Sequence, residues 1–216
     1  MRIKRSTLSN ITASLILSLL SAIVALWLFV WLAEEMREGD TRQFDTAVRA
    51  FIHSWSSPRL TGLMELFTAI GSGLSVTITT AVTALLLRAK DRRREAIWVT
   101  LAVVGGSLIM WTLKLSFHRE RPEPFFDMPL PSSYSFPSGH ALLSFTLFGA
   151  IAALLNARQN NAAVRGLIWS IAAALVAAIG LSRIYLGVHY PSDVVAGYLG
   201  AFVWMLGVGI AERKSR

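Results

Sequence analysis

Long uncharged segments recur along the chain and indicate its class. A helix needs about 20 apolar residues to cross a hydrocarbon core of roughly 30 Å. Six segments approach or exceed that length: residues 11–33, 66–87, 96–113, 141–157, 166–182 and 194–211. The last four are somewhat short, so we expect each of these helices to include flanking residues. The first is too long for a signal-peptide core, so we expect it to be a retained helix. The pattern predicts an all-α membrane protein with six transmembrane helices, folded as one membrane-embedded domain over residues 1–216.

The segment over residues 41–56 follows a different pattern. Its large apolar residues recur at helical spacing: Phe44, Val48, Phe51, Ile52 and Trp55. This spacing predicts an amphipathic helix that lies at the extracytoplasmic membrane interface or caps the bundle. Polar residues fill the intervening positions, and we expect Asp45, Arg49 and His53 to form a solvated face without a chemical role.

Composition supports the membrane assignment, and the placement of charge orients the chain. Of 216 residues, 54% are hydrophobic and 16% charged, with 21 basic and 13 acidic side chains. The basic excess gathers in four short segments: Arg2, Lys4 and Arg5; residues 88–95; Arg158 and Arg165; and residues 212–216. If six helices alternate in direction, all four lie on one face, as is typical of a cytoplasmic face. We therefore expect both termini in the cytoplasm and no nucleic-acid partner.

Ionisable residues also gather at the helix ends of the opposite face, which is extracytoplasmic in this arrangement. They are Lys114, Arg121, His140, Arg183, His189 and Asp193. Charged side chains at membrane depth are costly unless they are paired or line a wet cavity, so they are functional candidates. Three separate helix ends are therefore expected to meet at one site.

The spacing of His189 and Asp193 indicates a catalytic pair. Pro191 suits the first turn of a helix, and from that turn the Asp193 carboxylate can reach back to one imidazole nitrogen. Such a carboxylate fixes the tautomer and raises the basicity of the other nitrogen. His189 is therefore a candidate nucleophile.

The stretch PSGH at residues 137–140 is typical of an anion site. Pro137 opens a helix, and Ser138 and Gly139 bring backbone N–H groups to its N-terminus. With three nearby cations, two histidines, no carboxylate cluster and no cysteine in the chain, the site is expected to bind an oxyanion without a metal or other cofactor. Phosphoryl transfer needs mainly positioning and charge stabilisation, which such a site supplies.

Three ordered stretches resemble the signature motifs of a known family. They are KLSFHRERP at residues 114–122, PSGH at 137–140 and SRIYLGVHYPSD at 182–193. Their order and spacing are similar to those of the type 2 phosphatidic acid phosphatase superfamily, and the six-helix layout resembles its integral-membrane lipid phosphatase branch. The resemblance implies that His189 attacks phosphorus to form a phosphohistidine, that Asp193 orients it, and that His140 protonates the leaving alkoxide. It also implies a set of phosphate-binding residues: Lys114, Arg121, Ser138, Gly139 and Arg183.

The resemblance leaves the substrate and some alternatives open. It implies hydrolysis of a lipid phosphomonoester or pyrophosphate head group, with phosphatidylglycerophosphate, phosphatidic acid and a polyprenyl pyrophosphate as candidates. A lipid phosphotransferase would use the same site, a soluble vanadate-dependent haloperoxidase is disfavoured by six spans, and a lipid or anion transporter remains from a different class. The expected partners are a membrane lipid phosphate and the bilayer, without an obligate protein partner. Prolines at residues 116–137 predict an irregular loop, and its role in gating access stays open.

Overall fold

The computed structural model describes residues 5–127 and 130–214, and every regular element in that part of the chain is a helix. The helices are α1 (Arg5–Glu38), α2 (Thr41–His53), α3 (Pro58–Ile70), α4 (Gly73–Ala89), α5 (Arg93–Phe117), α6 (Gly139–Asn156), α7 (Ala162–Tyr185) and α8 (Pro191–Lys214). The all-α prediction is confirmed. Arg2, Lys4, Ser215 and Arg216, which belong to the basic segments noted above, lie outside the described residues.

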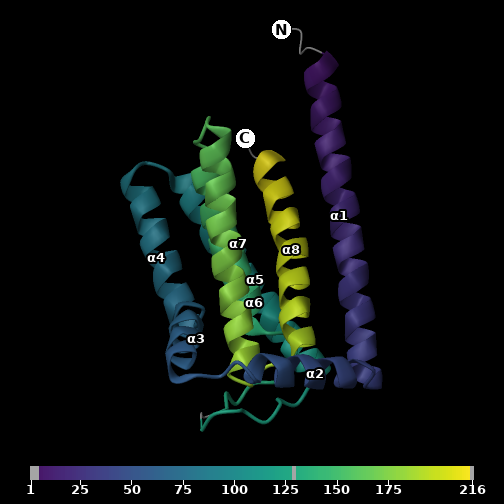
Figure 1. The fold of residues 1–216 in the computed structure, drawn as a ribbon. Helices are drawn as coiled ribbons and strands as arrows, with labels where there is room; N and C mark the ends of the chain where they lie inside the picture. The colour runs from purple at the N-terminus through teal and green to yellow at the C-terminus, as the bar shows by residue number, and fades with distance from the viewer. Residues whose placement is uncertain (1–4, 128–129, 215–216) are drawn as a thin grey trace.

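Within the described residues, five helices are long and apolar enough to cross a membrane: α1, α5, α6, α7 and α8. Helices α3 and α4 pass the same test together, which gives up to six spans if this bent pair counts as one. The long helices run side by side, and α2 lies across one end of them (Figure 1). We call this the α2 end; it also holds the loops at residues 118–138 and 186–190. The opposite end, called the basic end, holds the connections at residues 90–92 and 157–161.

The second span differs from the single helix expected over residues 66–87. It begins at Pro58, where Ser57 caps the helix, and it bends by 51° between α3 and α4. Gly71 ends α3, and the Ser72 hydroxyl caps α4 by accepting from the Ser75 N–H at 3.2 Å. A Cβ at Gly71 would overlap Ile179 of α7, so only glycine allows this close approach. The break lies beside His140, whose ring is the next nearest neighbour of that Cβ position.

Helix α2 is amphipathic, but its faces are not those expected. Thr41, Asp45 and Ile52 are buried against the bundle, whereas Phe44 and Phe51 are exposed. The exposed aromatic side suits a helix that lies on a membrane surface. The expectation that Asp45 is solvated is wrong, because its side chain is completely buried between α2 and the start of α8.

Helix α6 is the central element of the bundle and packs against α4, α5, α7 and α8. Most of its first half is buried, including Ala141, Leu142 and Leu147. Gly197 of α8 lets the two helices approach, since a Cβ there would lie 2.7 Å from the Ser138 carbonyl oxygen. The N-terminus of α6 is thereby held rigidly at the α2 end.

Candidate active site

A pocket of about 170 Å³ at the α2 end is lined by residues of α4, α5, α6 and α7 and of the loops between helices. Six of the eight site residues expected from the sequence line it: Lys114, Arg121, Gly139, His140, Arg183 and His189. The other two, Ser138 and Asp193, are fully buried beside it. Asp193 contacts the lining residue His189, and the Ser138 N–H donates to the Asp193 carbonyl oxygen. The structure thus brings all eight residues into one cluster.

His189 and Asp193 form a buried pair. The His189 side chain is in the turn between α7 and α8, is 1% exposed, and has its Nδ1 atom 3.2 Å from Oδ2 of Asp193. The same carboxylate oxygen accepts from the Tyr190 N–H at 2.9 Å and from the Ser135 hydroxyl. A carboxylate only accepts hydrogen bonds, so the proton of the neutral imidazole belongs on Nδ1. The lone pair is then on Nε2, which lies 3.1 Å from the Arg121 guanidinium.

Burial disfavours the protonated form of this imidazole. Desolvation lowers the pKa of His189 to about 3, although the adjacent Asp193 carboxylate opposes that shift. A neutral imidazole whose lone pair is on Nε2 is the form that can act as a nucleophile, once an anion takes the place of Nε2 as the acceptor for Arg121.

The turn that carries His189 depends on Gly187. This residue has φ +77°, and a Cβ on it would lie 2.6 Å from the backbone nitrogen of Phe125. The N–H groups of Val188 and His189 both donate to the Arg183 carbonyl oxygen, at 3.2 and 3.3 Å. The turn therefore links the end of α7 to the loop at residues 118–138 and directs the imidazole into the pocket.

Three cations face the pocket without a compensating carboxylate. Lys114 is 4% exposed and Arg183 6% exposed, and neither they nor Arg121 forms an ion pair within residues 5–127 and 130–214. Arg121 donates to the Ser133 and Val188 carbonyl oxygens at 2.8 and 2.9 Å, and burial lowers its pKa. Buried cations held only by neutral groups are costly, which favours a site that is completed by an anion.

Unused donors point to the same conclusion. The Ser138 hydroxyl and Nε of Arg183 are buried without a hydrogen-bond partner in the described structure. Ser138 is the N-cap of α6 and Gly139 its first residue, so helix N–H groups without intrahelical acceptors lie here too. The arrangement of cations, helix N-terminus and neutral imidazole is suited to holding a tetrahedral oxyanion beside His189.

Sequence reasoning missed several residues that hold the site together. Thr68 accepts from Arg183, Ser133 accepts from Arg121 at 3.1 Å, and Ser135 donates to Asp193. Arg119 also donates to Asp193, and Asp45, which had been expected on a solvated face, accepts from Arg119. Arg119 lies inside the first motif and was detectable there, whereas Ser133 and Ser135 carry no local signal beyond their place in the loop.

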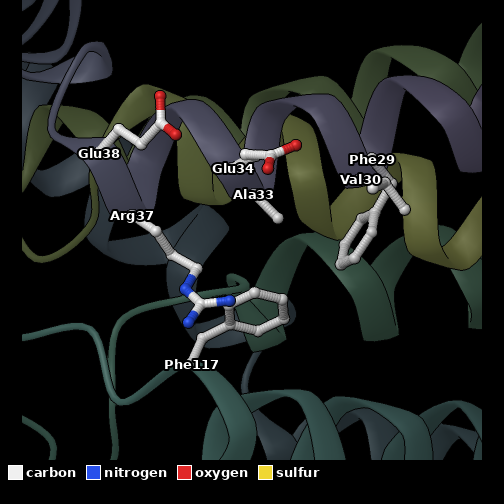
Figure 2. A pocket seen from close by; sticks show the side chains of 7 residues that line it. All are labelled: Phe29, Val30, Ala33, Glu34, Arg37, Glu38 and Phe117. Carbon is white, nitrogen blue, oxygen red and sulfur yellow. The ribbon is translucent and has the colours of Figure 1, made fainter.

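A larger groove at the same end is separate from this cluster. It has a volume of about 600 Å³ and lies between the end of α1 and Phe117 of α5; Glu34, Arg37 and Glu38 also line it, and the Arg37 side chain extends toward Phe117 (Figure 2). Apart from Phe117, its lining residues lie outside the three motifs, and none of them is one of the eight expected site residues. Size alone therefore does not mark the functional cavity.

The fold and the cluster together define a membrane protein with an oxyanion site at its helix ends, and the family follows from the sequence. Residues 95–216, more than half of the chain, match the PAP2 superfamily, so this chain belongs to the PAP2 superfamily. Its members include membrane phosphatases of lipid and polyprenyl phosphates.

Particular relatives are similar over part of their length. An undecaprenyl-diphosphatase from Sulfolobus acidocaldarius is 34% identical over 135 residues, which are 60% of this chain and 61% of that protein. Phosphatidylglycerophosphatase B from Bacillus subtilis is 33% identical over 111 residues, 50% of this chain and 54% of that one. The matches span about half to three fifths of these relatives.

A solved structure shares the fold over nearly the whole chain. It is the crystal structure of a transmembrane PAP2 type phosphatidylglycerolphosphate phosphatase from Bacillus subtilis, with a TM-score of 0.79 and 24% sequence identity. The likeness covers 89% of this chain and 96% of that one, so it extends beyond the family-matched residues 95–216.

Proposed function

We propose that the chain is an integral-membrane phosphatase that removes phosphate from a membrane lipid phosphate or pyrophosphate, with residues 1–216 as one functional domain. The observation that carries the proposal is the buried His189 imidazole, paired with Asp193 in a pocket that Lys114, Arg121 and Arg183 line without forming an ion pair in the described residues. Membership of a superfamily of membrane phosphatases supports it.

The proposed reaction has two displacements at phosphorus. The lone pair of His189 Nε2 attacks, a P–N bond forms, and the P–O bond to the lipid breaks. His140 gives its proton to the leaving oxygen, which departs as an alcohol or as a phosphate. Water then attacks the phosphohistidine, His140 takes a proton from that water, and the P–N bond breaks to release inorganic phosphate and free His189.

The remaining residues of the cluster hold the phosphoryl oxygens. Lys114, Arg121 and Arg183 supply positive charge, and Ser138 and Gly139 supply the helix N-terminus. Preorganised donors of this kind stabilise charge as it develops in the transition state. Asp193 keeps the Nδ1 proton of His189 in place throughout.

The dimensions of the pocket suit a head group rather than a whole lipid. About 170 Å³ accommodates a phosphate or pyrophosphate, and the pocket lining also includes the exposed Trp111 and the buried Met110 and Leu143, apolar side chains suited to the start of a lipid tail. Phosphatidylglycerophosphate is one candidate substrate, from the relative that is a phosphatidylglycerophosphatase B. A polyprenyl pyrophosphate is the other, from the relative that is an undecaprenyl-diphosphatase.

One assay tests the proposal and ranks the substrates. Purified protein in detergent, with excess chelator, is given phosphatidylglycerophosphate, phosphatidic acid or undecaprenyl pyrophosphate, and phosphate release is measured. Release from at least one lipid without added metal is expected. Activity that is lost in the chelator and restored by Mg²⁺ would contradict the proposed mechanism, and transfer of phosphate to a second lipid would identify a phosphotransferase.

We also propose that the α2 end faces outward and that both termini are cytoplasmic. The proposal is supported by the basic residues of the two connections at the basic end, among them Arg92 and Arg158. The chain has no cysteine, so a single cysteine can report each side. In intact spheroplasts, a membrane-impermeant maleimide should label Ser132→Cys and not Asn160→Cys, two exposed positions at opposite ends. The reverse labelling would invert the orientation.

A further inference from the structure

Two buried carboxylates from distant parts of the chain meet on one guanidinium. Nη2 of Arg119 lies 2.7 Å from Oδ2 of Asp45 on α2, and Nη1 lies 2.6 Å from Oδ1 of Asp193 on α8. Both carboxylates are completely buried, and the Arg119 side chain is 13% exposed. Buried, charge-assisted contacts of this length are among the stronger and more directional hydrogen bonds in proteins.

Ser192 closes the contact between α2 and α8. Its N–H donates to Oδ1 of Asp45 at 3.0 Å, and its hydroxyl donates to Oδ2 at 2.6 Å. Nη1 of Arg119 lies 2.8 Å from the same hydroxyl. The Asp45 carboxylate therefore binds the first turn of α8, where negative charge is favoured by the helix dipole.

The same face of α2 also holds the loops on either side of the pocket. Arg49 donates to the carbonyl oxygens of Glu123 at 2.6 Å and Gly187 at 3.1 Å. The guanidinium of Arg119 stacks over the Tyr190 ring, with its central carbon 4.0 Å from the ring centroid. Helix α2 is thus bonded to each segment that supplies His189 or Asp193.

The oxygens of Asp193 have separate partners. Oδ1 accepts from Arg119, and Oδ2 accepts from His189, Tyr190 and Ser135. The torsion that orients a carboxylate is soft, so partners on both oxygens are needed to fix its plane. Arg119 is in turn fixed by Asp45, because its guanidinium forms an ion pair with each of the two carboxylates.

We propose that Asp45 and Arg119 are positioning residues that hold Asp193, and through it the His189 imidazole, in the reactive orientation. Helix α2 is then part of the catalytic apparatus rather than only a membrane-surface helix. This inference rests on the proposed function, because it assumes that His189 performs the chemistry.

The test compares Asp45→Asn and Arg119→Gln with wild type and with Asp40→Asn, an exposed position that makes the same chemical change on the N-cap of α2. The lipid that wild type hydrolyses fastest is the substrate, and inorganic phosphate is the inhibitor that reports the oxyanion pocket. We expect kcat to fall about 10²-fold in both variants, since a displacement of about 1 Å costs that much. We expect KM and the inhibition constant of phosphate to stay within about twofold, since Lys114, Arg121 and Arg183 are untouched. Asp40→Asn is expected to match wild type.

A double variant separates positioning from general destabilisation. In an Asp193→Asn background, Arg119→Gln should cost less than about threefold more, because its effect passes through Asp193. Arg119→Lys, which keeps the charge but cannot bridge both carboxylates, should lie between wild type and Arg119→Gln and guards against a folding defect in the latter.

The outcomes are distinct. Three results would each overturn the inference and leave the proposed function standing. They are full activity in both Asp45→Asn and Arg119→Lys, a multiplicative loss of kcat in the double variant, and a loss of phosphate binding equal to the loss of kcat. If wild type and Asp40→Asn release no phosphate from any lipid, the proposed function fails and the inference fails with it.

Discussion

The two ends of the helix bundle both carry cationic side chains, but the cations of the pocket at the α2 end and those of the basic end lie in opposite surroundings. At the basic end, Arg93 and Arg94 are exposed, and the Arg158 side chain is 57% exposed. At the α2 end, Lys114 and Arg183 are almost completely buried. In the sequence, a lysine or arginine at a helix end looks the same in both places. Only its packing in the fold distinguishes a charge that orients the chain in the membrane from one that binds an anion.

The partners of these cations differ as well. Glu95 pairs with both Arg92 and Arg158 at the basic end, in contacts that remain open to water. Lys114 is bonded instead to the carbonyl oxygens of Tyr134 and Ser135, which carry no net charge. Exposed pairs are worth little in stability, whereas buried cations without counter-charges cost stability and are retained for what they bind. The following substitutions test this difference between the two ends, in order of decreasing expected effect.

The largest effect is expected at the two histidines of the α2 end. His189→Ala should lower kcat/KM by about 10⁴-fold or more for every substrate, because the covalent route is lost whatever group departs. His140→Ala should lose about 10²- to 10⁴-fold with a lipid phosphate, which expels a basic alkoxide. It should lose much less with p-nitrophenyl phosphate, whose leaving group needs no proton. Phosphate release from both substrates by both variants gives the comparison.

Two results would change that assignment. If the aryl substrate rescues His189→Ala and not His140→Ala, the two roles are exchanged. If His140→Ala raises KM equally for both substrates, His140 binds the phosphate instead of protonating the leaving group.

The sequence predicts this site better than it predicts what supports the site. The contact between His189 and Asp193 is local, four residues apart, and the start of α8 at Pro191 brings it about. Each carboxylate that Arg119 bridges is 74 residues away from it along the chain, so no periodicity encodes that contact. Asp45 looks like any polar residue of an amphipathic helix until the packing of α2 is known.

The fold shows the same division. Hydropathy predicts the all-α class because a span must be apolar over its whole length. It does not predict the 51° bend between α3 and α4, because Gly71 and Ser72 barely interrupt the apolar run. At the bend, Gly71 lies against Ile179 and His140, which are distant in the sequence and meet it only in the folded bundle.

The second prediction removes one cation from each end. Arg183→Gln should lower kcat/KM by about 10²- to 10³-fold, the cost of losing one donor to a developing oxyanion. Arg94→Gln makes the same change at an exposed position of the basic end and should stay within about twofold of wild type. Equal losses in the two variants, measured on the same lipid, would mean that burial does not distinguish these cations.

The third prediction compares a glycine at each end. Gly187→Ala forces a side chain to φ +77° and against the Phe125 backbone, so it should destabilise the protein by about 1–3 kcal/mol and reduce activity. Gly166→Ala, in α7 toward the basic end, meets no atom within 4 Å and should stabilise its helix by up to about 1 kcal/mol. Thermal unfolding in one detergent gives both signs, and a stable, active Gly187→Ala protein would show that the turn tolerates a side chain.

The smallest effect is expected from the ion pairs of the basic end. Glu95→Gln removes the charge that pairs with Arg92 and with Arg158, whose Nη2 lies 3.3 Å from the carboxylate. Because the pairs are partly exposed, the loss should be below about 1 kcal/mol and should shrink further in high salt, and phosphate release should not change. Melting curves at low and high salt measure this directly. A loss of activity in Glu95→Gln would mean that the basic end is coupled to the pocket across the membrane. The basic end would then affect catalysis at the α2 end as well as the orientation of the chain.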